Sequence, residues 1–153
     1  MIHFQDQSAL NKLVSDQFSD WSQAVLVDQA LINQFADLSG DDFWIHTDST
    51  RCQEVGMQST IAQGFLLLVL LSKMRTGVDL AATLTGYSQI MNYGSNKLRF
   101  LAPVAEGSQV HARSRVADIS VDEKKTKVTM EWQINVVGQS NPSLLYHMAF
   151  VFL

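Results

Sequence analysis

A carboxylate and an imidazole lie five residues apart in the segment Asp41-Asp42-Phe43-Trp44-Ile45-His46. An imidazole titrates near neutral pH, so His46 together with Asp41 could hold a water molecule and accept and return its proton. The spacing alone is weakly diagnostic, because a histidine in such a loop is more often solvated or a capping residue. The pair therefore supports a hypothesis of acid–base chemistry that depends on the elements positioning it.

Gly64 is a second candidate for a functional residue, because it stands at the start of a predicted helix, directly before a strongly apolar run. A glycine at a helix start lets a ligand approach backbone N–H groups that lack an intrahelical acceptor, and such groups can stabilise an oxyanion. The alternative is that Gly64 only lets the helix enter a concave sheet without a clash. The residues themselves leave both interpretations open.

Two helices are expected to position these groups. Asp28 is a suitable N-cap and Gly40 a suitable end for the first helix, whose apolar residues recur at helical spacing. Those apolar residues are Leu31, Ile32, Phe35 and Leu38. The second helix is predicted to begin near Ile61 or Gly64 and to end near Arg75. Its stretch 65–71 is apolar on every side, so protein must surround it.

The second half of the chain has the period of β-strands. Apolar and polar residues alternate over 109–116 and 128–136, which is typical of half-buried strands. Further strands are expected over 82–92, 97–101 and 144–153, with a turn at 122–125. The first 27 residues are weakly patterned, with a short helix expected within 9–18.

These elements predict the α+β class, with a long antiparallel sheet wrapped around one buried helix, which is the hot-dog architecture. No linker or repeat divides the chain, so residues 1–153 are expected to form a single domain. Charged residues make up only 17% of the chain, fewer than in typical soluble domains. This shortage and the open edge of a lone sheet predict a homodimer with its pocket at the subunit interface.

Composition excludes several classes of function. A net charge of −4 and a pI near 5.4 argue against nucleic acid as a partner. The only cysteine, Cys52, excludes an internal disulfide and metal clusters held by several thiolates. No secretory signal is visible, and the longest apolar run, seven residues, is too short to span a bilayer. A cytoplasmic protein without membrane contact is therefore expected.

The segment around the acid–base pair resembles the hallmark of the MaoC-like dehydratase family, in particular the branch near nodulation protein N and the (R)-specific enoyl-CoA hydratases. The matching residues are Phe35, Ala36, Ser39, Gly40, Asp41, His46, Asp48, Ile61 and Gly64. Asn92-Tyr93-Gly94 and the segment 99–104 resemble two further motifs of that branch. The resemblance extends over roughly residues 10 to 153, essentially the whole domain.

The resemblance implies an (R)-specific enoyl-CoA hydratase, equivalently a 3-hydroxyacyl-thioester dehydratase, that reversibly adds water to a trans-2-enoyl thioester. Asp41 and His46 would bind the water, and the N–H of Gly64 would hold the thioester carbonyl. Five further residues are assigned to substrate binding: Gln63, Ser72, Asn92, Tyr93 and Gly94. No metal or redox cofactor is implied. The substrate would be an acyl-CoA or an acyl-carrier thioester, with coenzyme A present only as part of it.

The sequence departs from the family pattern at two places. Phe43-Trp44 replaces the usual Asn-Pro, and Gln63 replaces the common histidine before the glycine. Neither departure removes the acid–base pair, but both bear on substrate choice. Two alternatives remain open: a hot-dog acyl-thioesterase, and an acyl-thioester-binding module without turnover.

Overall fold

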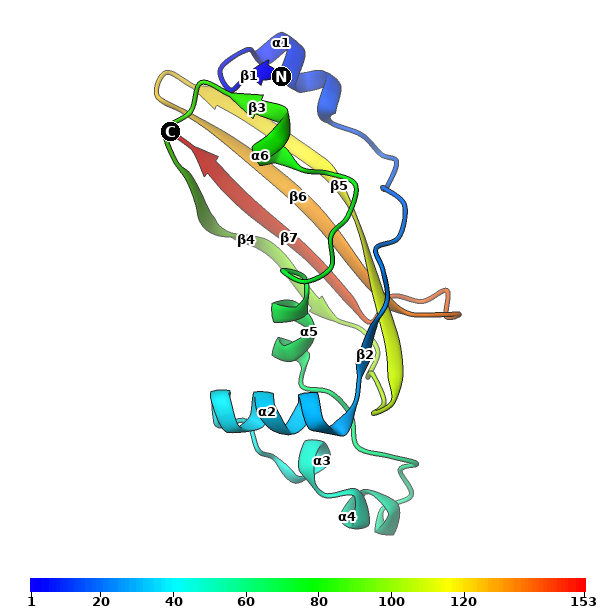
Figure 1. Cartoon of the computed structure of the whole chain (residues 1–153). Coiled ribbons are helices and arrows are strands. Elements are labelled where there is room, and N and C mark those ends of the chain that lie inside the picture. Colours follow the sequence, from blue (N-terminus) through cyan, green and yellow to red (C-terminus); the bar gives the residue numbers. More distant parts are fainter.

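Five antiparallel strands, in the order β2-β5-β6-β7-β4, form the main sheet of the computed structural model, which describes residues 1–153 (Figure 1). The strands are β2 (Val25–Val27), β4 (Ile90–Phe100), β5 (Ser108–Asp122), β6 (Lys125–Val136) and β7 (Leu144–Phe152). A small parallel sheet joins β1 (Ile2–His3) to β3 (Leu84–Thr85). This architecture confirms the predicted α+β hot-dog fold.

The alternating segments form the centre of this sheet. β5 and β6 pair from Val110 opposite Val136 to Asp122 opposite Lys125, and the turn between them lies where it was predicted. Val110 and Ala112 are buried on the face of the sheet that packs against the apolar helix α5 (Gly64–Leu70). We call this the helix face and the opposite side the outer face.

The strand predicted over 82–92 is wrong for most of its length. Residues 80–83 form α6 (Leu80–Thr83), capped by the Asp79 carboxylate, which accepts a hydrogen bond from the N–H of Ala82. Gly86 then adopts a left-handed conformation with φ of +85°, which turns the chain before β4 begins. Irregular pairing of β4 with β7 between Asn92 and Gly94 disturbs the regular alternation that identifies a strand in sequence.

Five more helical elements are α1 (Gln7–Leu10), α2 (Gln29–Ser39), α3 (Trp44–Thr47), α4 (Ser49–Glu54) and α5 (Gly64–Leu70). The caps predicted for α2 are confirmed, because Asp28 accepts from the N–H of Leu31 and Gly40 has a φ of +78°. A 3₁₀ turn over Asn11–Leu13 follows α1, and the helix expected within 9–18 goes no further. The chain beyond it lies along β5, where Ser19 donates its N–H to the carbonyl of Ser114.

α5 packs on the helix face and supplies three of the residues of the main hydrophobic core, Leu66, Leu67 and Leu70. It is shorter than predicted, since its regular helix ends at Leu70. It is also not fully surrounded: the side chains of Phe65 and Val69 are 59% and 57% exposed in the single chain. A second core cluster, which includes Leu10, Leu84 and Phe152, lies toward the end of the sheet that carries both termini (Figure 1).

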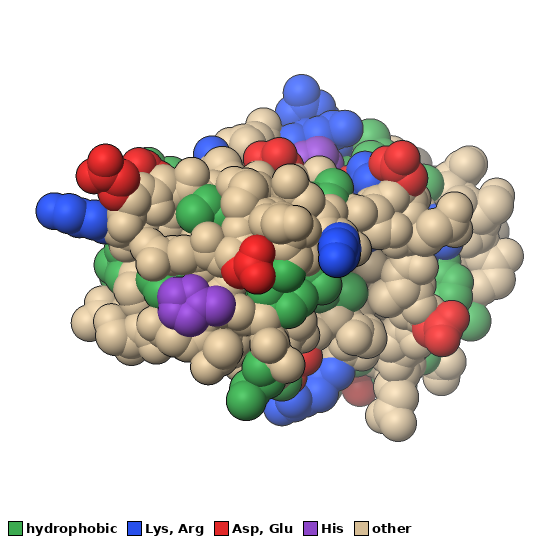
Figure 2. Space-filling model, turned by 90° about the horizontal axis from the view of Figure 1, so that it is seen from above, with side chains coloured by type: hydrophobic (Ala, Val, Ile, Leu, Met, Phe, Trp, Pro, Cys, Tyr) green, Lys and Arg blue, Asp and Glu red, His purple; other side chains and the backbone are tan.

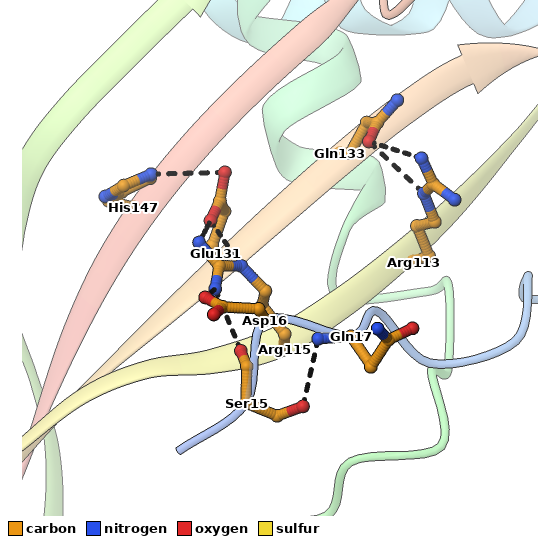
Figure 3. A network of polar contacts seen from close by, with 8 residues as sticks. All are labelled: Ser15, Asp16, Gln17, Arg113, Arg115, Glu131, Gln133 and His147. Carbon is orange, nitrogen blue, oxygen red and sulfur yellow. Dashed lines mark hydrogen bonds and ion pairs between the residues drawn. The ribbon is translucent and has the colours of Figure 1, made fainter. Parts of the chain in front are cut away.

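The outer face carries a row of charged side chains across three strands. The Arg115 guanidinium contacts the Glu131 carboxylate at 2.5 Å and the Asp16 carboxylate at 3.0 Å (Figure 3). His147 lies on the other side of Glu131, with a separation of 3.5 Å. These contacts tie the segment after α1 to the middle of the sheet.

Charged groups are dispersed at the end of the molecule that carries the termini. Figure 2 shows acidic and basic side chains there scattered among uncharged ones, without a concentrated basic patch. None of the helices combines the length and hydropathy that a bilayer crossing would require.

Candidate active site

His46 is fixed by a hydrogen bond to the main chain. It lies on the single turn of α3, and its Nδ1 is 2.7 Å from the carbonyl oxygen of Ile61. A carbonyl can only accept, so Nδ1 carries the proton in this contact. In the neutral ring the other nitrogen, Nε2, then has a free lone pair and can act as a base.

Hydrogen bonds from two polar side chains hold the turn that carries His46. Gln29 of α2 donates its side-chain amide to the His46 carbonyl at 2.8 Å, and the hydroxyl of buried Thr60 donates to the Gln29 amide oxygen at 2.5 Å. The N–H of Ile61 bonds the carbonyl of Ile45 at 3.1 Å. Sequence reasoning missed Gln29 and Thr60, because a glutamine in a helix and a threonine in a loop give no local signal of such contact.

His46 and Gly64 line one cavity, of about 370 Å³, which we call the site cavity. Its other walls are mainly apolar and include Phe65, Phe100 and Ser143. Gly64 is the first residue of α5, so its N–H has no acceptor within the helix. A side chain at this position would be crowded, since a Cβ would lie 2.9 Å from the Phe100 ring. The structure thus brings together two of the three residues predicted to be catalytic.

Asp41 lies at the surface beside this site, just after the C-terminal end of α2. Its carboxylate makes no hydrogen bond to His46 and does not line the site cavity in the single chain. Its backbone is held, because its N–H donates to the Ser39 hydroxyl and its carbonyl accepts from the Gln63 side chain at 3.2 Å.

The Gln63 side chain connects the segments around the start of α5. Its side chain is fully buried, does not line the site cavity, and donates to the carbonyls of Ile32 and Asp41. Gln63 thus joins α2 and the Asp41 segment to the start of α5, and its role in substrate binding stays a prediction. A glutamine amide can donate to two carbonyls at once, which explains how it bridges them.

Ser72 and Asn92 meet in a second cavity, of about 320 Å³, beyond the C-terminal end of α5. We call it the distal cavity. Its remaining lining is apolar or aromatic and includes Trp132, Tyr146 and Phe150. Burial raises the pKa of the Tyr146 phenol above its ordinary value of 10.0. The distal cavity lies away from His46, so one chain does not gather all the predicted residues.

Tyr93 and Gly94 do not join Ser72 and Asn92. Asn92 pairs with Phe150, whose side chain lines the distal cavity on the helix face. Tyr93 instead lines a separate pocket, of about 280 Å³, with Lys127 and Val151, and a Cβ on Gly94 would meet open space. Within one chain Tyr93 and Gly94 therefore lie apart from the distal cavity, and their contact with substrate stays a prediction. Successive side chains of a strand point to opposite faces of the sheet, which explains why Tyr93 and its neighbour Asn92 lie on different sides of β4.

The family model described as MaoC like domain matches residues 14–137 of the chain. The protein belongs to the MaoC-like family. It is 36% identical over 126 residues to the 3-hydroxyacyl-thioester dehydratase Z of Mycobacterium tuberculosis strain H37Rv, covering 82% of this chain and 80% of the relative. It is 33% identical over 140 residues to nodulation protein N of Rhizobium meliloti strain 1021, covering 90% and 84%. The predicted MaoC-like family and the similarity to nodulation protein N are thus confirmed.

Solved structures agree with this membership at the level of the fold. The (R)-hydratase from A. caviae superposes on this MaoC-like chain with a TM-score of 0.67 and 22% identity, covering 89% of this chain and 96% of the other. In the MaoC-like chain no group of three or more His, Cys, Asp or Glu side chains is placed to hold a metal ion.

Proposed function

We propose that the protein is a hydro-lyase that reversibly adds water to a trans-2-enoyl thioester to give an (R)-3-hydroxyacyl thioester. The relative of 36% identity is a 3-hydroxyacyl-thioester dehydratase, and the hallmark residues of the family are present in this chain. The observation that carries the proposal is the joint placement of His46 and Gly64 in one largely apolar cavity. Such a cavity suits an uncharged acyl thioester.

The reaction uses His46 Nε2 as the base. The Nδ1 proton is committed to the Ile61 carbonyl, so Nε2 takes a proton from water as the water oxygen bonds to C3 of the substrate. The double-bond electrons move toward the thioester carbonyl, where the Gly64 N–H stabilises the developing enolate oxygen. A proton returned to C2 completes the addition of one water molecule.

Asp41 shares the water with His46 in this proposal. Its carboxylate is free of other hydrogen bonds, and its backbone is anchored to Gln63, which is itself fully buried. Small closure of the exposed Asp41 segment over the cavity would let the carboxylate accept from the same water. Either group can then return the proton to C2.

Substrate trials with enoyl-CoA thioesters of different chain length test the activity, followed as loss of the conjugated absorbance. Asp41→Asn and His46→Gln are each expected to remove most of the rate, and the double variant to cost little more, because groups acting together are non-additive. Asp42→Asn is the control, since Asp42 is a neighbouring exposed carboxylate. Full activity in both single variants would contradict the proposal, and release of free thiol would favour the thioesterase.

A homodimer is the second part of the proposal. β4 is the last strand of the sheet and pairs only with β7, so one side of its backbone is open. Met91 and Tyr93 on this strand are 45% and 66% exposed, and Phe65 and Val69 extend the apolar surface over α5. An open strand of this kind can pair with the same strand of a second copy, which is a self-complementary contact.

Such pairing would also join the two cavities. The site cavity lies at the start of α5 and the distal cavity just beyond its end. A two-fold axis between antiparallel α5 helices places the start of one helix beside the end of the other. Ser72 and Asn92 of each subunit would then lie near His46 and Gly64 of its partner, and the apolar distal cavity would receive the acyl chain.

A further inference from the structure

Ser143 is a buried serine whose hydroxyl has no partner. It directly precedes β7, its side chain is 1% exposed, and its Oγ makes no hydrogen bond. Two other buried side-chain atoms also lack a hydrogen bond: Gln63 Oε1, and His147 Nε2, which has the 3.5 Å contact with Glu131. An unpaired buried hydroxyl costs free energy, so each such group calls for an explanation.

The position of Ser143 relates it to the proposed chemistry. It lines the site cavity together with His46 and Gly64. It is the neighbour of Leu144, which pairs with Phe100, and the Phe100 ring lies against Gly64. The serine thus belongs to the same side of the cavity as the first residue of α5.

The backbone of Ser143 is held by two hydrogen bonds, so it cannot easily shift to give the hydroxyl a hydrogen-bond partner. Its N–H donates to the carbonyl of Ile134 at 2.8 Å, and its carbonyl accepts from the N–H of Leu101 at 2.9 Å. Both main-chain groups are therefore already committed. The hydroxyl alone is free, and a hydroxyl is both a donor and an acceptor.

We propose that the Ser143 hydroxyl binds the carbonyl oxygen of the acyl thioester, as a second donor beside the N–H of Gly64. This inference rests on the proposed function and adds a residue that neither the hallmark motif nor any sequence pattern picks out. A thioester carbonyl has two lone pairs and can accept both bonds. Two preorganised donors would stabilise the enolate oxygen more than the neutral carbonyl, because negative charge develops there only during the reaction.

Ser143→Ala tests the role, with Ser114→Ala as the matched control. Ser114 is also fully buried on the sheet, but its hydroxyl is partnered by that of Thr76 at 2.6 Å. We expect Ser143→Ala to keep or raise the urea midpoint of unfolding while kcat with crotonyl-CoA falls about hundredfold to thousandfold. Ser114→Ala should lower the midpoint and leave kcat unchanged.

A spectroscopic readout separates this role from a structural one. Hydrogen bonds to a carbonyl lower its stretching frequency, so ¹³C-labelled butyryl-CoA, which cannot react, should show a lowered frequency when bound to the wild-type protein. In Ser143→Ala the frequency should move back toward that of free butyryl-CoA. Ser143→Cys, of similar size but a weaker donor, should lie between the two and serves if the alanine variant does not fold.

The outcomes distinguish the two proposals. If the wild-type protein hydrates enoyl-CoA while Ser143→Ala changes neither kcat nor the carbonyl frequency, the role of Ser143 is overturned and the activity stands. If the wild-type protein hydrates no enoyl-CoA, the proposed function fails. The carbonyl frequency of bound butyryl-CoA then still decides whether Ser143 contacts a thioester.

Discussion

At the scale of single residues, the site depends on main-chain acceptors and donors more than on side-chain pairs. His46 is oriented by a carbonyl of the segment before α5, and Asp41 is held through its own backbone. The contact of His46 fixes a proton on Nδ1 and leaves Nε2 free, and it requires no second ionisable group. The His46 ring is therefore oriented in the absence of substrate.

Gly64→Ala separates packing from chemistry at this scale. The added Cβ would lie 2.9 Å from the Phe100 ring, but that ring is 47% exposed and can turn aside. The intrinsic helix preference improves by up to about 1 kcal/mol. We expect little change in the free energy of unfolding, measured in urea, and a large fall in hydratase activity.

A second substitution provides the control for Gly64→Ala. Phe100→Leu removes the ring that the new methyl group would meet. If the methyl group blocks the thioester itself, the double variant stays inactive, as we expect. Activity restored in the double variant would mean that Gly64 is needed only to make room for Phe100.

At the scale of elements, the row of charges on the outer face connects the N-terminal segment to β5 and β6. Arg115 contacts both Glu131, which is 12% exposed, and Asp16, which is fully exposed. Exposed ion pairs contribute little, whereas a shielded partner left alone is costly. The two contacts of one guanidinium should therefore differ in their effect on stability.

Truncation of the two partners measures this difference. Glu131→Ala should lower the free energy of unfolding by about 1–3 kcal/mol, because it leaves Arg115 and His147 without their shared carboxylate. Asp16→Ala should leave it nearly unchanged. Chemical denaturation of both variants gives the comparison, and equal losses would show that the row acts as one unit.

His111 on the same sheet makes the stability of the protein depend on pH. Its ring stacks on Trp21 at 3.9 Å, and burial together with the Arg113 charge lowers the pKa of His111 below its ordinary value of 6.5. The unfolded chain then binds a proton more readily than the folded one. Stability contributed at this position is thus present above pH 6.5 and is lost as the pH falls below that value.

His111→Phe keeps a flat ring against Trp21 and removes the titration. The stability advantage of the wild-type protein over this variant should shrink between about pH 7.5 and about pH 5.5. Urea unfolding at both pH values measures it. Parallel profiles for the two proteins would contradict a lowered pKa at this position.

At the scale of the whole molecule, the residues assigned to the site are divided between two separate cavities of one chain. The site cavity holds the proposed base, and the distal cavity holds Ser72 and Asn92. Asn92 and Phe100 are eight residues apart on β4, or about 26 Å along a strand. In the proposed homodimer, a second copy paired in the opposite direction would offer a short path between the cavities.

Mixed dimers test this arrangement directly. His46→Gln and Asn92→Ala are each expected to be weakly active alone. When the two variants are unfolded and refolded together, half of the dimers contain one of each, and one of their two sites is intact if Asn92 acts on the partner. We therefore expect recovery to about a quarter of wild-type activity. No recovery, or a monomer by sedimentation, would contradict a shared site.

The sequence by itself determined the local elements and the motif. Asp28 and Gly40 specify the ends of α2, and alternation specifies β5 and β6, because caps and side-chain periods act over a few residues. The motif likewise identified the MaoC-like family and the residues Asp41, His46 and Gly64. These features depend on neighbours in the chain, so they can be read without coordinates.

Only the tertiary structure decided which of these residues meet. It placed Gln29 and Thr60 behind His46, buried Gln63, and left the Ser143 hydroxyl unpaired. Each of these outcomes depends on contacts between distant segments: Gln29 and Thr60 are 31 residues apart. No local pattern specifies such pairs, because they arise only when the sheet and α5 pack together.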